Sequence, residues 1–463
     1  MVLLLLALLA STLLVAMVAI LKLTRAKPSL TTIKANNPSF NGLRYTKQRS
    51  TTVSNASLIN NNPNNISYVP FREASISKAV VVDCTHPDAP TFTHHKSARN
   101  PEGLEPADTS TGLVLNALAS GSAFPGWLDR DAVTVNHFDG DALFSVWAFI
   151  HRADAMHYEE LLRIAAALHD FRELDFDGTG SAAKLAHQAL ALCCWINTIE
   201  RAQFTPPFEE SDADEKFSFF LANLGIFLEN PENFKDIWQP EYEQVLEDYK
   251  LIEKQGQVKK YPEIGVAIVR CPRPVHYYAL FSHTLDCDVV VSFQHRDCDE
   301  DKDTPSDKRA DSGSGSGVNG SGWRYEVEEK YTQFVNVWSR PVTARLDMTP
   351  LASFLNEIDT HRAVDCDWAS PRLVDSGPLL RLDSHGQKLL KAQRYGHPTA
   401  RPMHTSGLPP EIFENVILSF FKFGLQGVAP RVGGFGWDEL HQLNANKIDW
   451  NVWKAQIKAS LDI

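Results

Sequence analysis

The chain has 463 residues, of which 43% are hydrophobic and 22% charged, and its formal net charge at pH 7 is −12. This composition indicates folded domains with apolar cores, and the length allows two or three of them. A net negative charge of this size argues against long-range attraction to nucleic acid or to an anionic membrane surface. We therefore expect no nucleic-acid patch, whereas a small anionic substrate is allowed because a bound cation can reverse the local charge.

The N-terminal residues 1–21 contain no charged side chain. A helix of this length, at 1.5 Å per residue, is about as long as the ~30 Å hydrocarbon core of a bilayer. We therefore predict an N-terminal transmembrane helix and a single-pass membrane protein. The alternative is a cleaved signal peptide, which normally has a charged start, a shorter apolar core and small residues before the cleavage site.

The residues after this segment predict its orientation. Lys22, Arg25 and Lys27 follow it directly, and the positive-inside rule then places the rest of the chain in the cytosol. The seven cysteines agree, since their number is odd and none has a CxxC spacing. The secretory lumen is the alternative, because the chain also contains three Asn-x-Ser sequons, at Asn55, Asn65 and Asn319.

Composition changes along the chain predict its domains. Residues 22–77 are rich in Asn, Ser and Thr without apolar periodicity, which is typical of a disordered linker. We expect a three-layer α/β domain with a mainly parallel sheet over 78–255 and an α+β domain over 256–463. Within the latter, the charged and Gly/Ser-rich stretch 296–322 is predicted to be a disordered insertion.

Hydrophobic patterns place the individual elements. In the first domain we expect strands at 79–83 and 133–136, followed by helices at 108–119, capped by Asp108, and at 142–150. Apolar residues spaced three and four apart predict three more helices between 182 and 252. In the second domain we expect strands at 264–270, 276–282, 289–294 and 323–338, and helices that begin at 349 and 409.

The stretch VTVNHFDGDALFSVW (133–147) places His137, Asp139 and Asp141 at alternate positions after a predicted strand. In an extended backbone these side chains point to one side, and in open α/β sheets ligands bind beyond the carboxyl ends of strands. Oxygen and imidazole ligands suit Mn²⁺, Mg²⁺ or Zn²⁺, and the following helix offers its N-terminal amides to a phosphate. The alternative is that both acids are turn and capping residues and that His137 is merely packed.

The segment NHFDGDALFS resembles the first motif of the DHH phosphoesterases, which include RecJ-type exonucleases, oligonucleotide and cyclic-dinucleotide phosphodiesterases and family II pyrophosphatases. The resemblance implies that His137, Asp139 and Asp141 hold two Mn²⁺ ions and that Ser145 supports the following helix. An Asp-His-His motif does not follow downstream. The chain also resembles an uncharacterised family that carries an HFDxDxxxS segment, a likeness that implies no activity.

Further ligands are predicted around this motif. Asp83 ends the first strand, and His94 and His95 lie in the loop after it, so both loops open on one edge if the two strands are neighbours. Asp170 is a candidate by analogy with the second acidic motif of the DHH enzymes. The alternatives are an exposed polar loop and, for Asp170, an ordinary residue at a helix end.

These observations predict a membrane-anchored, metal-dependent phosphoesterase or pyrophosphatase. Its catalytic residues would be His137, Asp139 and Asp141, its metal Mn²⁺, and its substrate a small phosphorylated compound. The metal ligands would be the same three residues together with Asp83, His94, His95 and Asp170. The alternative is a non-catalytic, membrane-tethered binding or scaffold protein.

Overall fold

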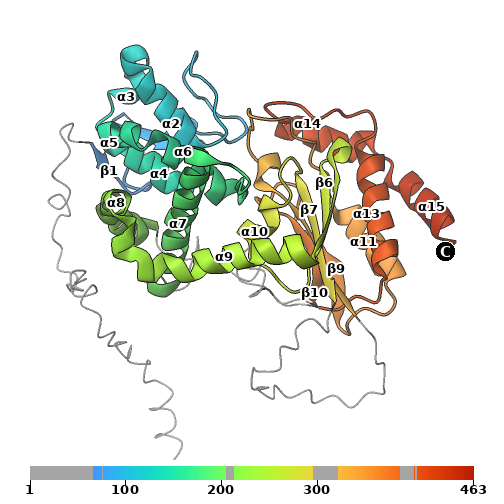
Figure 1. Cartoon of the computed structure of the whole chain (residues 1–463). Helices are drawn as coiled ribbons and strands as arrows, with labels where there is room; N and C mark the ends of the chain where they lie inside the picture. The colour runs from blue at the N-terminus through green and yellow to red at the C-terminus, as the bar shows by residue number, and fades with distance from the viewer. Residues whose placement is uncertain are drawn as a thin grey trace, which may run out of the picture. The chain divides into compact units, whose positions relative to one another are not determined.

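The computed structural model describes residues 66–75, 77–204, 213–295, 322–385, 401 and 404–462. The predicted membrane helix, the linker up to residue 65 and residues 296–321 of the predicted insertion lie outside these ranges. Among the helices that are described, none has both the length and the apolar character needed to cross a bilayer. The described chain is a mixed α/β protein with one parallel and one mixed sheet (Figure 1).

The parallel sheet has the strand order β1-β4-β2-β3, formed by β1 (Ser67–Tyr68), β4 (Ala132–Thr134), β2 (Ala79–Val82) and β3 (Thr91–Phe92). All four residues of β2 are buried, as expected for a strand covered on both faces. β2 and β4 are neighbours, so their carboxyl ends open on the same edge of the sheet. β1 lies within the predicted linker, and it is ordered because its backbone pairs with β4, which composition does not reveal.

Helices surround this sheet in the first half of the described chain. α4 (Gly140–Ile150) is buried at every position and packs against α2 (Ser110–Ala119) and α6 (Glu159–Phe171). Further helices are α3 (Pro125–Leu128), α5 (Arg152–His157), α7 (Gly180–Gln203), α8 (Ala213–Glu229) and α9 (Lys235–Gln255). α4, α6 and α7 share one hydrophobic core with the sheet residues Val80, Val82 and Val133.

The predicted cap of α2 is wrong. Thr109 is the N-cap, and its side chain accepts a hydrogen bond from the Gly112 amide. The Asp108 carboxylate instead accepts hydrogen bonds from the amides of Trp338 and Ser339, far along the chain. A long-range partner has therefore displaced a local one.

The mixed sheet has the order β5-β6-β7-β8-β10-β9, in which only β6 and β7 are parallel. Its strands are β5 (Gln257–Tyr261), β6 (Val266–Arg270), β7 (Val289–His295), β8 (Trp323–Glu329), β10 (Leu379–Ser384) and β9 (Cys366–Ala369). The predicted strand 276–282 is wrong, because α10 (Tyr277–Ser282) occupies it. The His276 side chain caps this helix by accepting a hydrogen bond from the Tyr278 amide. The aromatic residues of α10 are buried in the helix.

Alternate residues of the mixed sheet face two helical layers (Figure 1). Val266 and Val291 pack with α11 (Thr349–Ile358), α13 (Pro410–Gly424) and α15 (Trp450–Leu461). Val269 and Val290 pack with α9 and α10. This two-residue period is the pattern of a sheet that is covered on both faces. The short α14 (Trp437–Gln442) and α15 follow α13 and were not predicted.

The predicted strand 323–338 is too long. β8 ends at Glu329, and a 3₁₀ turn at Tyr331–Gln333 follows. The amide of the buried Lys330 still donates to the carbonyl of Asp288, which precedes β7, and the chain leaves the sheet after this residue. The segment 331–339 then contacts the loop that contains His94 and His95.

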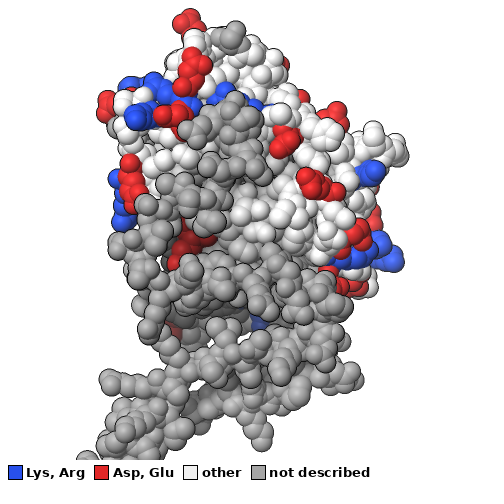
Figure 2. Space-filling model, turned by 90° about the vertical axis from the view of Figure 1, so that its left-hand side faces the viewer, with Lys and Arg blue, Asp and Glu red and all other residues white. Residues whose placement is uncertain are grey.

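One face of the molecule shows how its surface charges are arranged (Figure 2). Lys and Arg side chains lie among Asp and Glu side chains over the described part of this face. No broad patch of one sign appears there. Other acidic side chains, among them Asp83 and Asp141, are buried at the carboxyl edge of the parallel sheet.

Candidate metal centre

Asp83 lies at the carboxyl end of β2 with a φ of 50°, in the left-handed region. Asp tolerates this conformation better than most residues, and such backbone strain is frequent at functional sites. Its Oδ1 accepts a hydrogen bond from Ser110 Oγ at 2.7 Å and lies 3.5 Å from His94 Nε2. Its Oδ2 lies 3.3 Å from His137 Nε2. The two carboxylate oxygens therefore face histidines from two different loops.

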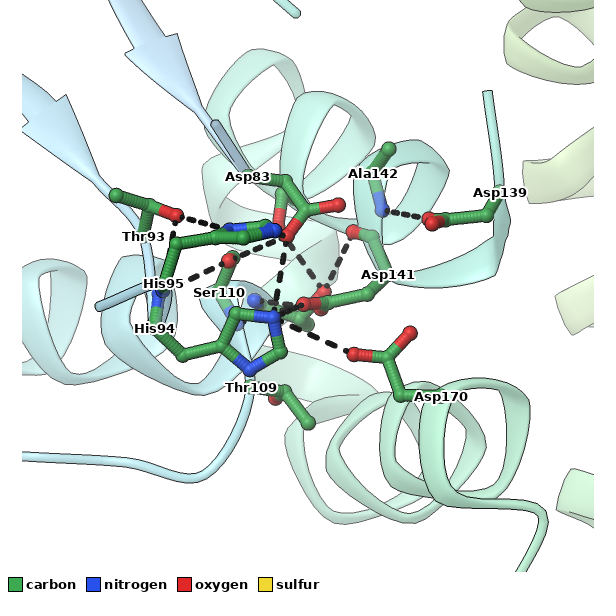
Figure 3. A network of polar contacts seen from close by, with 12 residues as sticks. Asp83, Thr93, His94, His95, Thr109, Ser110, Asp139, Asp141, Ala142 and Asp170 are labelled. Atoms are coloured by element: carbon green, nitrogen blue, oxygen red, sulfur yellow. Dashed lines mark hydrogen bonds and ion pairs between the residues drawn. The ribbon is translucent and has the colours of Figure 1, made fainter. Parts of the chain in front are cut away.

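His94 is buried, and its protonation is set by a backbone group. Its Nδ1 lies 2.5 Å from the Asp108 carbonyl oxygen, which can only accept, so Nδ1 carries the proton. Nε2 faces three carboxylates, at 3.5 Å from Asp83, 3.8 Å from Asp141 and 3.5 Å from Asp170 (Figure 3). Metal-binding histidines commonly donate their other N–H to a backbone carbonyl in this way.

Asp141 and Asp170 complete the surroundings of His94. Both oxygens of Asp141 accept backbone hydrogen bonds at the N-terminus of α2, from Ser110 at 2.7 Å and Thr111 at 2.8 Å. Asp170 Oδ2 is buried and has no hydrogen-bond partner within the described residues. Burial, and then the carboxylates of Asp141 and Asp139, raise the pKa of Asp170 well above its usual value. A cation beside this carboxyl would favour its ionised form.

His137 and Asp139 form a second set with Asp83. His137 Nδ1 lies 2.8 Å from Asn136 Oδ1, and its Nε2 lies 3.0 Å from Asp139 Oδ2. Burial opposes a charge on His137, but Asp139 and Asp83 raise its pKa well above the usual value. Burial likewise opposes the Asp139 charge, but His137 lowers the pKa of that carboxyl below its usual range.

The alternative role of Asp139, that of a helix-capping residue, is confirmed for one of its two carboxylate oxygens. Asp139 is the N-cap of α4, and its Oδ1 accepts from the Ala142 amide at 2.8 Å. The extended geometry expected for residues 137–141 ends at Gly140, where α4 begins. Asp141 consequently faces His94 and not His137, because a helix does not continue the alternation of a strand.

His95 is engaged at both ring nitrogens. Nδ1 lies 2.7 Å from Thr93 Oγ1 and 4.0 Å from Asp83 Oδ1, and Nε2 lies 3.0 Å from the Tyr331 hydroxyl. Burial, and then the nearby His94, lower its pKa well below the usual value. His95 therefore links the cluster to the second half of the chain.

The possible ligand atoms fall into three overlapping sets, each with atoms within 4.8 Å of one another. Asp83 and His94 each belong to two of them. Every residue that the sequence predicts as a metal ligand occurs in at least one set. The sets are Asp83, His94 and His95; Asp83, His137 and Asp139; and His94, Asp141 and Asp170.

The chemistry of these donors suits a cation. Throughout the described part of the chain, the ion pairs of these acids are made with histidines and none with Lys or Arg. Burial, and then Asp141 and Asp139, raise the pKa of Asp83 to about 7. A divalent cation would remove this repulsion, and mixed imidazole and carboxylate ligands suit Mn²⁺ or Zn²⁺. The buried His/Asp groups could therefore hold a metal ion.

The residues around the ligands were not predicted from the sequence. Ser110 and Thr111 bind Asp141 through their amides, and the Asp108 carbonyl orients His94. The run Asp108-Thr-Ser-Thr marks a helix start, which is the signal that an anion could bind there. That Asp141 binds this helix start could not be predicted, because α2 and α4 come together only in the folded protein.

A pocket lies beside the cluster. His137, Asp139 and Asp170 line it from the first half of the chain, and Tyr277, Phe281, Glu328 and Tyr331 are among those that line it from the second. Its volume is about 210 Å³, whereas one water needs roughly 10–15 Å³. The pocket therefore has room for a phosphate group and an attached organic group.

Comparison with known proteins identifies a family. No curated protein and no solved structure matches the chain. The resemblance to the DHH phosphoesterases is not confirmed by these comparisons. The model described as "Family of unknown function (DUF6687)" matches residues 64–302 and 314–432, which contain all the candidate ligands. The chain therefore belongs to the DUF6687 family.

Proposed function

We propose that this protein is a metal-dependent hydrolase of phosphate esters or anhydrides. One observation carries the proposal. Four clustered carboxylates, of Asp83, Asp139, Asp141 and Asp170, have only histidines as ionic partners within the described residues. Like charges buried together are costly without a compensating cation, so such a cluster favours metal binding over a purely structural role.

The ligand sets favour two ions. His137 and Asp139 would hold one with Asp83 Oδ2, and His94, Asp141 and Asp170 would hold the other, which Asp83 Oδ1 also faces. A carboxylate whose two oxygens face two ligand sets suits a bridge between cations. Divalent cations in such a site supply Lewis-acid polarisation of phosphoryl oxygens and acidify water. Mn²⁺ accepts this mixture of ligands and is the first metal to test.

The surroundings favour a phosphorylated substrate. The pocket opens beside Asp139 and Asp170, and its size accommodates a phosphate with a small organic group. The motif's resemblance to the DHH phosphoesterases supports the same reaction class. The chain lacks the downstream Asp-His-His motif that supplies metal ligands in the DHH enzymes. His94 and Asp170 would supply ligands in its place.

Metal content of the purified full chain tests the proposal. We expect stoichiometric Mn, Zn or Fe in the wild type and loss of metal in D139A and D141A, with a far-ultraviolet circular dichroism spectrum that is unchanged. The Mn²⁺-loaded wild type should hydrolyse bis-p-nitrophenyl phosphate or pyrophosphate. A folded wild type that binds no metal would support the rival function, a binding or scaffold protein. Metal without turnover of either substrate would remove the hydrolase assignment.

We also propose that residues 1–21 anchor the protein in a membrane with the remainder in the cytosol. The uncharged 21-residue run and the following Lys22, Arg25 and Lys27 support this placement. The protein should stay with the membrane fraction after carbonate washing. Its gel mobility should not change in N55Q or N65Q, and a glycan at either site would place the chain in the secretory lumen instead.

A further inference from the structure

His169 lines the pocket one residue before Asp170, near the end of α6. The Gly140 amide donates a hydrogen bond to its Nδ1 at 3.0 Å. An N–H donor requires a lone pair on Nδ1, so the ring is neutral and carries its proton on Nε2. This is the opposite tautomer to that of His94, whose Nδ1 carries the proton.

This tautomer excludes His169 as a metal ligand. The lone pair of Nδ1 accepts the Gly140 hydrogen bond, and Nε2 carries a proton, so neither nitrogen can coordinate an ion. Nε2 is buried and has no hydrogen-bond partner among the described residues. A buried donor without an acceptor costs about 1–3 kcal/mol, so an acceptor on a bound ligand would be favoured.

The glycine of the HFDGD segment makes this contact possible. A Cβ on residue 140 would lie 2.3 Å from His169 Cγ and 2.8 Å from its Cβ, which are impossible distances. The imidazole ring therefore lies directly against the first residue of α4. Gly140 and His169 form one unit, although 29 positions separate them in the sequence.

The charged groups around His169 are mainly acidic. Asp139 and Glu200 favour a proton on the ring, Arg172 opposes it, and burial outweighs them and lowers the pKa of His169. Glu200 is itself paired with the buried Lys216 at 2.5 Å. The hydrogen bond from Gly140 makes the ring a neutral donor, and the proposed ions beside it would attract an anion to the same place.

We infer that His169 donates a hydrogen bond from Nε2 to an anionic oxygen of the substrate, on the phosphoryl group or its leaving group. The inference rests on the proposed function and adds a catalytic residue that binds no metal. The chemical class of the ligand atom follows from the donor, because a neutral imidazole N–H requires an acceptor. A phosphate oxygen is such an acceptor, whereas an ammonium group is not.

Two substitutions separate the two nitrogens of His169 in the Mn²⁺-loaded full chain. In H169N, the amide oxygen can still accept from Gly140, but the Nε2 donor is lost. In H169Q, the longer side chain carries an amide donor to the position of Nε2. We expect H169N to bind inorganic phosphate about 10–100-fold more weakly by calorimetry, with unchanged metal content, and H169Q to restore part of the affinity.

Gly140 provides an independent test of the same contact. G140A should displace the ring and weaken phosphate binding as much as H169N does. The double variant should be no worse than either single one, since both remove one interaction. Nitrogen NMR of the metal-free wild type should contain the signal of a neutral ring protonated at Nε2 that is absent in H169N, whereas the signals of other rings whose Nδ1 accepts an amide, such as His276, should remain.

The outcomes distinguish the inference from the proposed function. A wild-type protein that binds no metal overturns the proposed function, and the inference falls with it. Metal-loaded wild type and H169N with equal phosphate affinity would overturn the inference alone, as would an NMR signal that shows His169 protonated at Nδ1. Loss of metal in H169N would assign His169 to the ligands and also contradict the inference.

Discussion

Two groups of buried acids differ in how their charge is balanced. On β8, Glu326 lies 3.0 Å from Arg401, Glu328 lies 2.9 Å from Arg172, and Glu329 lies 3.1 Å from Arg345. At the edge of the parallel sheet, the ion-pair partners of Asp83 and its neighbours within the described residues are all imidazoles. Guanidinium groups of the chain balance the first group, whereas the second group could be balanced by a bound metal ion.

This difference distinguishes buried carboxylates that stabilise the fold from buried carboxylates that could bind a metal ion. A buried carboxylate that is paired with a guanidinium has its charge compensated within the fold, and breaking the pair destabilises the protein. In the second group, burial and then the neighbouring carboxylates raise the pKa values of Asp83 and Asp170, and a bound divalent cation would remove the repulsion between these carboxylates. The predictions below test this contrast.

The largest effect is expected from D83N, which removes the carboxylate shared by two ligand sets. Metal affinity should fall by more than the roughly 10–100-fold that outer-shell changes cost. At neutral pH the metal-free variant should be at least as stable as the metal-free wild type, because Asn resembles the neutral acid that burial favours. Equilibrium dialysis with Mn²⁺ measures the affinity, and D367N, at an exposed acid paired with His385, is the matched control. Equal metal affinity in D83N and D367N would contradict the assignment of Asp83 to a metal centre.

R345M should show the reverse behaviour. It leaves Glu329 buried without its guanidinium, which costs about 3–5 kcal/mol of unfolding free energy. Metal content should stay that of the wild type, since the pair lies outside the ligand sets. Urea denaturation measures the unfolding free energy, and metal analysis of the same sample measures the metal content. Loss of metal at unchanged stability would mean that β8 belongs to the metal centre.

A smaller effect is expected from pH on the metal-free protein. The pKa of Asp83 is about 7 in the folded state and near 3.8 when unfolded, so between these values the folded state holds a proton that the unfolded state has lost. Stability should therefore fall as pH rises from about 4 to 7, and level off above 7. The pKa of Glu329 is also raised to about 7 by burial, so the same scan of D83N isolates the contribution of Asp83. Identical slopes for the two proteins would contradict the assignment.

The smallest effect is expected from K454A. Lys454 Nζ lies 2.7 Å from Glu357 at the surface, and such exposed pairs contribute about 1 kcal/mol or less. Neither metal content nor phosphate binding should change. Thermal denaturation checks the stability, and a change in metal content would show that distant surface charges influence the cluster.

Much of the first half was predictable because its signals are local. The run AVVV forms β2, the strand before the HFDGD segment forms β4, and α4 follows at once. The sequence left the pairing of β2 with β4 as a condition, and in the structure this pairing brings Asp83 beside His137. The seven proposed ligands all occur in the sets that the fold assembles.

Other features were not predictable because distant residues decide them. β1 and β3 have two residues each and exist only by pairing with their neighbours. α10 has the aromatic composition of a strand, but it is a helix that packs against α9. Asp108 was predicted to be a helix cap, but its carboxylate accepts a hydrogen bond from the amide of Trp338, which lies 230 positions away.

The sequence by itself indicated which residues could hold a cation and that most of them follow two predicted strands. Only the tertiary structure decided how each ring nitrogen is used, because the Asp108 carbonyl and the Gly140 amide fix the protons of His94 and His169 in opposite ways. Either ring nitrogen of a neutral imidazole can carry the proton, and a hydrogen bond with a distant segment selects between them. For the same reason the Arg partners of Glu326, Glu328 and Glu329 became known only from the folded chain.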